Sequence, residues 1–433
     1  MLRDIVEEHL GEGAFLWTQW ERALVSPRYA LAEVADGPEE RLVAHLDGLS
    51  LARAEDLQRM LGDALGKDVL GTVFAAALAL LGAEGTGATG ELERLLAVAE
   101  KQPEDRVALA RAMGLCRRRE LEPELAALLK SPHRSAQVCA LEALAFRQVD
   151  VTASLRPFVL GEDPAVTAAA LRAARTGGSS VRPLVEYALT SPVPAIRDAA
   201  IETGLLLGLR GAWARARQAV ERGEEGAAFP LAVLAMAGDA ADLALVEKAL
   251  DLPRLRSSAL AAFAAGGTAR TAELCLAYLD DPVHGRLAGE AFSALTGIPI
   301  EGALERQEQE SGEPIPFEED DLDADLRPGP DGDLPLPRAE EIQRWWESIG
   351  RGLPSKVRLL GGKPFAIETL VELLSKGPMR RRRIAALELA TRTRGECAVE
   401  TRTWAREQER TLAAVRLAVR SQRLEPFSRL LQA

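Results

Sequence analysis

The feature that most constrains this chain is a proline that returns about every 30 residues. Six such prolines each precede a run rich in alanine and leucine, at intervals of 29, 32, 28, 61 and 29 residues. The long interval equals about two periods, and a glycine turn at residues 223–226 marks the missing boundary. Seven units of one length indicate a repeat protein, in which each unit packs on its neighbours. The prolines are Pro103, Pro132, Pro164, Pro192, Pro253 and Pro282.

Each unit predicts two helices, one before its proline and one after it. In four units Ser or Asp precedes the proline, which is the common pairing of an N-cap with proline in the first helical turn. The chain is 47% apolar but only 4% aromatic, and its alanines and leucines are strong helix formers. We therefore expect an all-α fold. The clearest first helices are 121–129, 181–189, 243–250 and 271–279, and the clearest second helices are 136–146, 195–207, 256–264 and 286–295.

The units resemble short HEAT repeats of the phycobilisome-lyase type, whose second helix often reads D-P-x-x-x-V-R-x-x-A-A. The best matches are Pro192 with Ile196, Arg197 and Ala200, and Pro378 with Arg382, Arg383 and Ala386. The other units keep the proline and the alanines but shift or lose the arginine. The resemblance implies an α-solenoid of about seven HEAT-like helix pairs, and a repeat type by itself says little about function.

Composition divides the chain into four segments. Residues 1–66 do not fit the repeat and predict an N-terminal helical cap or docking segment, and residues 67–301 hold the HEAT-like array. Residues 302–338 form an acidic, proline-rich linker with a net charge of −9, a composition that cannot bury a core. Residues 339–433 carry a net charge of +8 and predict a basic C-terminal helical domain with one further HEAT-like pair.

Two pairs of tryptophans are candidates for contact with a partner. Trp17 and Trp20 lie in an amphipathic pattern near the N-terminus. A solenoid needs a cap over its terminal apolar face, so this segment is either that cap or a docking module that uses the two rings. Trp345 and Trp346 begin the basic domain and are the second pair of candidates.

The whole chain resembles a bacterial family of uncharacterised HEAT-repeat proteins that is often encoded near type VI secretion genes. The resemblance rests on three stretches, which are residues 13–17 with 41–49, residues 286–297, and residues 345–346 with 359–361 and 383–390. The family supplies no activity to carry over. The resemblance implies a cytosolic accessory or adaptor protein.

Four consecutive arginines, Arg380, Arg381, Arg382 and Arg383, are the sharpest charge feature. We expect them in the first turn of a helix that begins at Pro378, where cations oppose the helix dipole. One interpretation is a solvated basic face with a Glu388–Arg392 pair four residues apart. The other is a dock for an acidic group, supplied either by the protein's own linker or by an acidic partner.

Several kinds of chemistry are disfavoured by residue type and spacing. A net charge of −12 argues against a general nucleic-acid binder, which would present a basic face. The four cysteines lie far apart without a CxxC pair, which suits reduced, buried thiols, and the four histidines show no metal-ligand spacing. We therefore predict no catalytic residue, no metal and no cofactor.

Two glycine motifs and one apolar run also have ordinary explanations. The GxGxxG at residues 85–90 follows a predicted helix rather than a strand, so we expect an interhelical loop. Gly361, Gly362 and Lys363 lack the upstream glycine of a phosphate loop. The apolar run 69–83 is shorter than the ~20 residues of a membrane span. Acids near the N-terminus disfavour a signal peptide, so we expect a cytoplasmic protein.

The sequence thus predicts a protein-binding scaffold or adaptor without catalytic activity, and the family resemblance adds an accessory role in a type VI secretion system. The alternative is a HEAT-repeat enzyme, lyase-like or DNA-glycosylase-like, with a site that the sequence does not reveal. A site of convergent polar groups with shifted pKa values would favour the enzyme.

Overall fold

The computed structural model describes residues 3–82, 93, 96–97, 100, 103–118, 120–237, 239–307, 331–421 and 425–431. Over these residues the fold is all-α apart from one short β-hairpin, which confirms the predicted class. Successive helices pack on one another, as in a helical repeat array. The chain forms two compact units, Met1–Arg215 with Leu374–Ala433 (unit 1) and Ala216–Leu373 (unit 2). The boundaries of the four predicted segments stay predictions.

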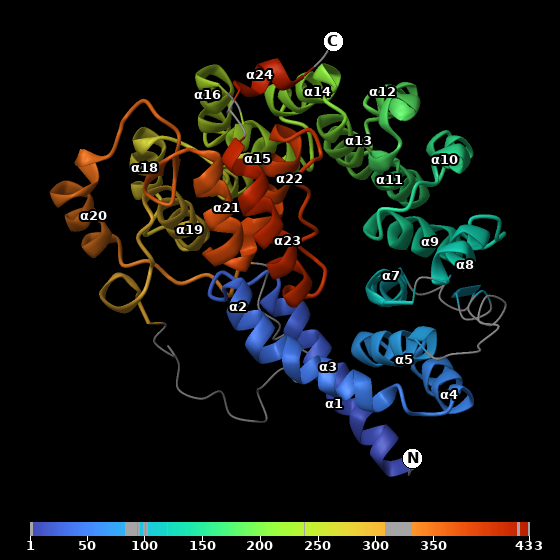
Figure 1. Ribbon diagram of the computed structural model, residues 1–433. Helices are drawn as coiled ribbons and strands as arrows, with labels where there is room; N and C mark the ends of the chain where they lie inside the picture. Colours follow the sequence, from blue (N-terminus) through green and yellow to red (C-terminus); the bar gives the residue numbers. More distant parts are fainter. Residues whose placement is uncertain are drawn as a thin grey trace, which may run out of the picture. The chain divides into compact units, whose positions relative to one another are not determined.

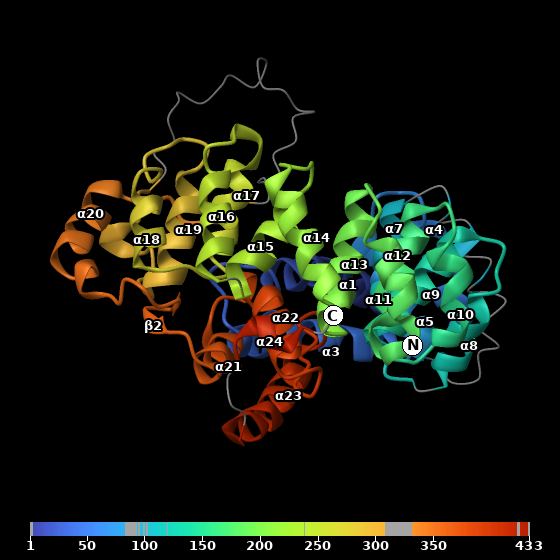
Figure 2. The same ribbon diagram turned by 90° about the horizontal axis from the view of Figure 1, so that it is seen from above.

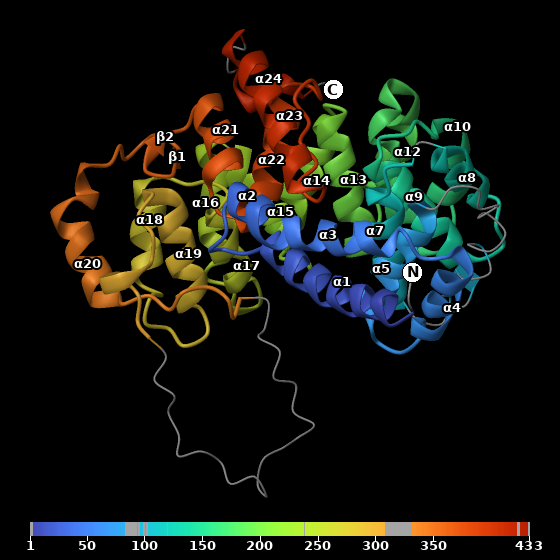
Figure 3. The same ribbon diagram turned by 60° about the horizontal axis from the view of Figure 1, so that its bottom comes forward.

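The N-terminal helices of unit 1 pack around a buried, alanine-rich helix. Helix α1 (Arg3–Ala23) packs against both α3 (Glu40–Leu49) and α5 (Leu70–Gly82), and Figure 3 shows α1 and α3 side by side. The predicted run 69–83 is therefore a buried helix, α5. Gly71 of α5 is required by packing, because a Cβ at this position would overlap the Ala14 carbonyl of α1. The remaining elements here are α2 (Leu31–Val34), a π-helical turn (Ala35–Glu39) and α4 (Ala54–Ala64).

The repeat helices of unit 1 follow the predicted order of first and second helices. The second helices pack in sequence from α5 through α7, α9 and α11 to α13. In Figure 1 they lie on the side of α22 and α23, whereas α8, α10 and α12 lie on the opposite side. We call α7, α9, α11 and α13 the inner helices. The bounds are α7 (Pro103–Leu115), α8 (Leu121–Leu128), α9 (Arg134–Phe146), α10 (Thr152–Val159), α11 (Pro164–Ala173), α12 (Arg182–Ala188), α13 (Pro194–Leu206) and α14 (Arg210–Glu221).

Side chains of one repeat bind carbonyl groups near the end of the inner helix in the preceding repeat. Arg147 donates to the Cys116 carbonyl, Arg175 to the Ala145 carbonyl, and Thr203 Oγ1 to the Leu171 carbonyl. Donor and acceptor are 31, 30 and 32 residues apart. The sequence period therefore reappears as contacts between neighbouring repeats. The last carbonyls of a helix have no partner within it, and these bonds supply one.

The predicted N-cap is right at one of the four Ser-Pro or Asp-Pro pairs and wrong at the other three. Asp163 accepts hydrogen bonds from the N–H groups of Ala165 and Val166, and α11 begins at Pro164. At the other three, the side chain binds an N–H two residues on, which forms a turn before the helix. The bonds are His133 N to Ser131 Oγ, Val193 N to Ser191 Oγ, and Val283 N to Asp281 Oδ1.

The C-terminal part of unit 1 contains α22 (Arg382–Arg392), α23 (Ala405–Ala418) and α24 (Phe427–Leu430). Helix α22 packs against α13, and α23 packs against α2 and the π-helical turn. The last 60 residues therefore fold together with the first 215. Local periodicity predicts the helices themselves but does not predict where they dock.

Unit 2 is a shorter series in which α15, α17 and α19 pack in sequence (Figure 2). A β-hairpin of β1 (Leu359–Leu360) and β2 (Lys363–Pro364) packs on α19, and its turn glycines Gly361 and Gly362 both have positive φ. The helices are α15 (Ala228–Ala237), α16 (Ala240–Ala249), α17 (Pro253–Phe263), α18 (Ala269–Leu276), α19 (Gly285–Thr296) and α20 (Ala339–Ser348). Helices α14 and α21 (Ile367–Lys376) both cross the boundary between the units.

Candidate partner-binding surface

The stretch that follows α22, non-helical up to Trp404 and including the first residues of α23, makes the longest-range contacts of unit 1. We call residues 396–407 the closing segment. Its side chains and backbone bind residues of α1, the π-helical turn, the end of α7 and the turn that follows α11. The contacts join residues 225 to 381 positions apart in sequence. They form by docking of the C-terminal part of unit 1 on its N-terminal part.

A carboxylate of α1 lies at the centre of these contacts. Glu21 accepts a hydrogen bond from Arg111 Nε at 2.8 Å and another from Arg402 Nη2. Arg111 also donates to the Arg402 carbonyl at 2.8 Å. Burial lowers the pKa of Arg402, and Glu21 counteracts that effect. One acid thus joins an inner helix to the closing segment.

An aromatic side chain anchors the same junction. Trp404 is buried against Trp20, with ring centroids 5.0 Å apart, and its Nε1 lies 3.4 Å from the Leu115 carbonyl. Arg117 lies over the Trp404 ring and pairs with Glu407 at 3.5 Å. Arg111 lies 5.5 Å from the centroid of Trp20. Two indole rings and two guanidinium groups therefore form one contact cluster.

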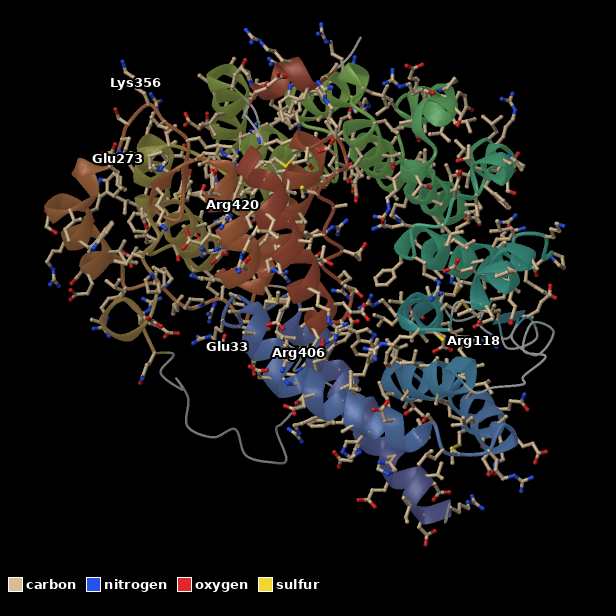
Figure 4. The ribbon with its side chains drawn as sticks, in the orientation of Figure 1. Glu33, Arg118, Glu273, Lys356, Arg406 and Arg420 are labelled. Carbon is tan, nitrogen blue, oxygen red and sulfur yellow. The ribbon has the colours of Figure 1, made fainter. Side chains whose placement is uncertain are left out.

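A buried acid of the π-helical turn caps α23 from outside. Glu39 is 2% exposed and accepts hydrogen bonds from the backbone N–H groups of Ala405 and Arg406, the first two residues of α23. It also accepts one from Trp20 Nε1 at 2.9 Å. Burial raises the pKa of Glu39, although these hydrogen bonds oppose the shift. Figure 4 shows Arg406 beside the N-terminal helices, where it pairs with Asp36.

A ladder of alternating charges runs along the inner helices. Glu142 of α9 pairs with Arg172 of α11, and their sequence separation is 30 residues. Glu202 of α13 lies near Arg172 and pairs with Arg383 of α22 at 3.6 Å. The ladder thus ends on one of the predicted arginines. Its acids and bases occupy equivalent positions of successive units, a signal that is present in the sequence at the repeat period.

The four predicted arginines do not share one environment. Helix α22 begins at Arg382, after a 3₁₀ turn (Met379–Arg381), so the predicted start at Pro378 is wrong by four residues. The Arg383 side chain is 76% exposed, whereas Arg380 and Arg381 are half-buried. Arg382 is 1% exposed, so it does not belong to a solvated basic face. Contact of the four with an acidic partner stays a prediction.

Arg382 instead supports the end of the preceding helix. Its Nε donates to the Leu374 carbonyl at 2.7 Å, and its Nη1 contacts Met379 Sδ. Burial lowers its pKa to about 10, and Nη2 has no hydrogen-bond partner among the described residues. The predicted Glu388–Arg392 pair is present at 2.7 Å, but it is buried rather than solvated.

Trp17 and Trp20 are both buried inside unit 1. Trp17 stacks on Phe74 of α5 with ring centroids 4.9 Å apart, and Trp20 is fully buried in the cluster with Trp404. Both rings therefore hold α1 in place. Their contact with a partner stays a prediction that this burial does not support.

Trp345 and Trp346 pack within unit 2. Both rings of α20 approach Phe292 of α19 edge-on, with centroid distances of 5.9 and 5.8 Å. Trp346 is 6% exposed, and Trp345 is half-buried. Of the four predicted tryptophans, Trp345 is the most accessible. A contact of either ring with a partner stays a prediction.

The cysteines and the Gly361–Gly362 turn, which the sequence raised as possible sites of chemistry, have structural roles. All four cysteines are buried and free, and burial raises the pKa of Cys139 and of Cys275 to about 12, which keeps both thiols protonated. The N–H groups of Gly361 and Gly362 bind carbonyls at the end of α19. The GxGxxG at residues 85–90 and the densest acids of the linker lie outside the described residues.

One pairing escaped the sequence analysis. His9 of α1 and His45 of α3 place their Nδ1 atoms 3.2 Å apart, although 36 residues separate them in sequence. The described residues contain no group of three or more His, Cys, Asp or Glu side chains arranged to hold a metal ion. The packing of α1 on α3 brings the two rings together. The sequence does not indicate the pair, because the two histidines are too far apart to lie on one turn of a helix.

No protein-family model matches the chain, and no curated protein matches it either. Within the described part of the chain, no helix has both the length and the apolar character that a bilayer crossing requires.

Proposed function

We propose that the protein is a non-catalytic adaptor that binds a segment of a partner protein on the inner helices of a HEAT-like α-solenoid. One observation carries the proposal. The inner side of unit 1 already binds a stretch of polypeptide that is non-helical up to Trp404, the closing segment, through ion pairs, a main-chain hydrogen bond and a buried tryptophan. Stacked helix pairs commonly expose extended surfaces of this kind to partners.

Part of this surface has no cover from the closing segment. Val107 of α7 is 58% exposed and lies one helical turn before Arg111, so both residues share one face of the helix. An exposed valine beside a charged cluster suits a partner segment with both apolar and charged residues. From the family resemblance, we further propose an accessory role in a type VI secretion system in the cytoplasm. Exposed Arg383 supports an acidic partner.

A matched pair of variants tests this function. Three full-length chains are compared: the wild type, Val107→Asp and Val283→Asp. Each is used to capture proteins from the source cells, and mass spectrometry identifies the captured proteins. Val283 is 71% exposed but lies in unit 2, so it controls for an added surface charge. We expect a protein that the wild type and Val283→Asp enrich and that Val107→Asp loses. Equal capture by all three chains, or no enriched protein, would contradict the proposal. No described feature favours the HEAT-repeat enzyme over the adaptor.

A further inference from the structure

Three side chains at alternate positions of the closing segment bind three different groups of unit 1. Glu400 faces Arg175 at 3.4 Å, Arg402 binds Glu21, and Trp404 packs on Trp20. We call Trp20, Glu21, Arg111, Arg117 and Arg175 the receiving surface. An acid, a base and an aromatic ring each meet a complementary group on it.

Four of the five receiving residues, all except Arg117, also have partners outside the closing segment. Arg175 donates to the Ala145 carbonyl, which fixes its guanidinium at the end of α9. Glu21 binds Arg111 Nε of α7, and Trp20 Nε1 donates to Glu39. A site whose side chains have independent support binds a peptide with a smaller ordering cost. These four residues therefore keep part of their support when the occupant changes.

One residue supplies most of the buried contact of the occupant. The Arg117 side chain is 67% exposed, so its pair with Glu407 contributes little, whereas the Arg402–Glu21 and Arg175–Glu400 pairs are half-buried. Trp404 is 4% exposed and supplies the largest buried surface of the three anchors. A partner segment with the same three anchors would make the same contacts. The chain's own segment then has only the advantage of being tethered nearby.

Building on the proposed function, we propose that the receiving surface recognises partner segments with an acidic residue, a basic residue two positions later and a tryptophan four positions later. Glu400, Arg402 and Trp404 occupy the surface in cis until such a segment displaces them. The apparent affinity for a partner segment is then lowered, because only molecules whose receiving surface is unoccupied can bind it.

A peptide in trans tests the exchange on the full chain. The probe is a fluorescent peptide of residues 396–410 with serine in place of Cys397, and binding is followed by fluorescence anisotropy. In Trp404→Ala the place of the indole is open, so we expect this variant to bind the peptide at least tenfold more tightly than the wild type. Trp346→Ala, a buried tryptophan of unit 2, should show no gain. A peptide with alanine at the tryptophan position should bind none of the chains.

The outcomes separate this inference from the proposed function. If Trp404→Ala does not fold, as judged by circular dichroism, the double change Glu400→Ala and Arg402→Ala replaces it, with an expected gain of about threefold. Equal peptide binding by the wild type and the weakened variant, or no binding by either, overturns the inference. Dimers of the wild type that the peptide dissociates would make a second copy the occupant and also overturn it. In each of these cases the Val107-dependent capture of a partner still tests the function independently.

Discussion

Unit 1 and unit 2 use the same kind of helix pair, but different contacts complete them. In unit 2 side-chain hydrogen bonds join residues tens of positions apart, as between Arg254 and the Gly223 carbonyl, 31 residues apart, or between Arg358 and the Ala265 carbonyl, 93 apart. In unit 1 the bond between Arg402 and Glu21 spans 381 positions. Contacts of that range must offset a larger loss of chain entropy.

Strong side-chain contacts are concentrated where segments far apart in sequence meet. Unit 1 concentrates two tryptophans, a three-residue ion cluster and a buried helix-capping acid at the junction of its distant parts. Unit 2 instead relies on packing between neighbours, such as the two tryptophans of α20 on Phe292. Removing an anchor should therefore affect distant segments in unit 1 and only adjacent helices in unit 2.

The largest expected effect comes from removing one buried tryptophan in each unit. Trp404→Ala should lower the free energy of unfolding of unit 1 by about 3–5 kcal/mol, the usual cost of such a truncation in a core. Hydrogen exchange should rise in α1, the end of α7 and α23 together, because Trp404 contacts Trp20 and the Leu115 carbonyl and directly precedes α23. Trp346→Ala, the control, should raise exchange in α19 and α20 alone. Exchange that rises only in α23 of the Trp404 variant would contradict the comparison.

An intermediate effect is expected from a glycine where two helices meet. Gly71→Ala places a Cβ against the Ala14 carbonyl and should cost roughly 1–3 kcal/mol of stability, as overpacking does. Gly11→Ala in α1 meets no atom within 4 Å and should stabilise by up to ~1 kcal/mol, because alanine favours helix. Urea unfolding of both variants measures the difference. A Gly71 variant as stable as the wild type would show that α1 is held by the closing segment rather than by α5.

The smallest effect concerns pH, and the two units should respond with opposite sign. Burial raises the pKa of Glu39 in unit 1, so the wild type should lose stability relative to Glu39→Gln as pH rises from the ordinary glutamate value through the raised pKa. In unit 2, hydrogen bonds from the backbone of His284 and Val283 lower the pKa of Asp281. The wild type should therefore lose stability relative to Asp281→Asn as pH falls below the ordinary aspartate value through the lowered pKa.

Unfolding curves for each variant and the wild type across this pH range test the signs. The difference between wild type and variant is the measured quantity, because it cancels the carboxylates that both chains share. The same sign in both units would mean that burial does not outweigh the hydrogen bonds at Glu39, or that the backbone N–H groups do not stabilise the Asp281 carboxylate.

Local sequence signals were sufficient for the helices. The proline period and the alanine-rich runs predict the inner helices because helix formation depends on residues within a few positions of one another. Asp163 is found as an N-cap, and Glu388 and Arg392 are found as a pair, for the same reason. The charge ladder from Glu142 through Arg172 to Glu202 repeats at the unit length and could have been read from the sequence as well.

Only the tertiary structure decided which of these groups are buried and which distant residues meet. Arg382 and Arg383 are neighbours of one type, yet one is buried beneath α21 and the other is exposed beside α13. The pairing of Glu21 with Arg402 follows no period, because the docking of one end of the chain on the other brings them together. The sequence by itself determined the helical units and their order, since those depend on local spacing. The closure of unit 1 depends on packing between segments hundreds of residues apart, for which local spacing carries no signal.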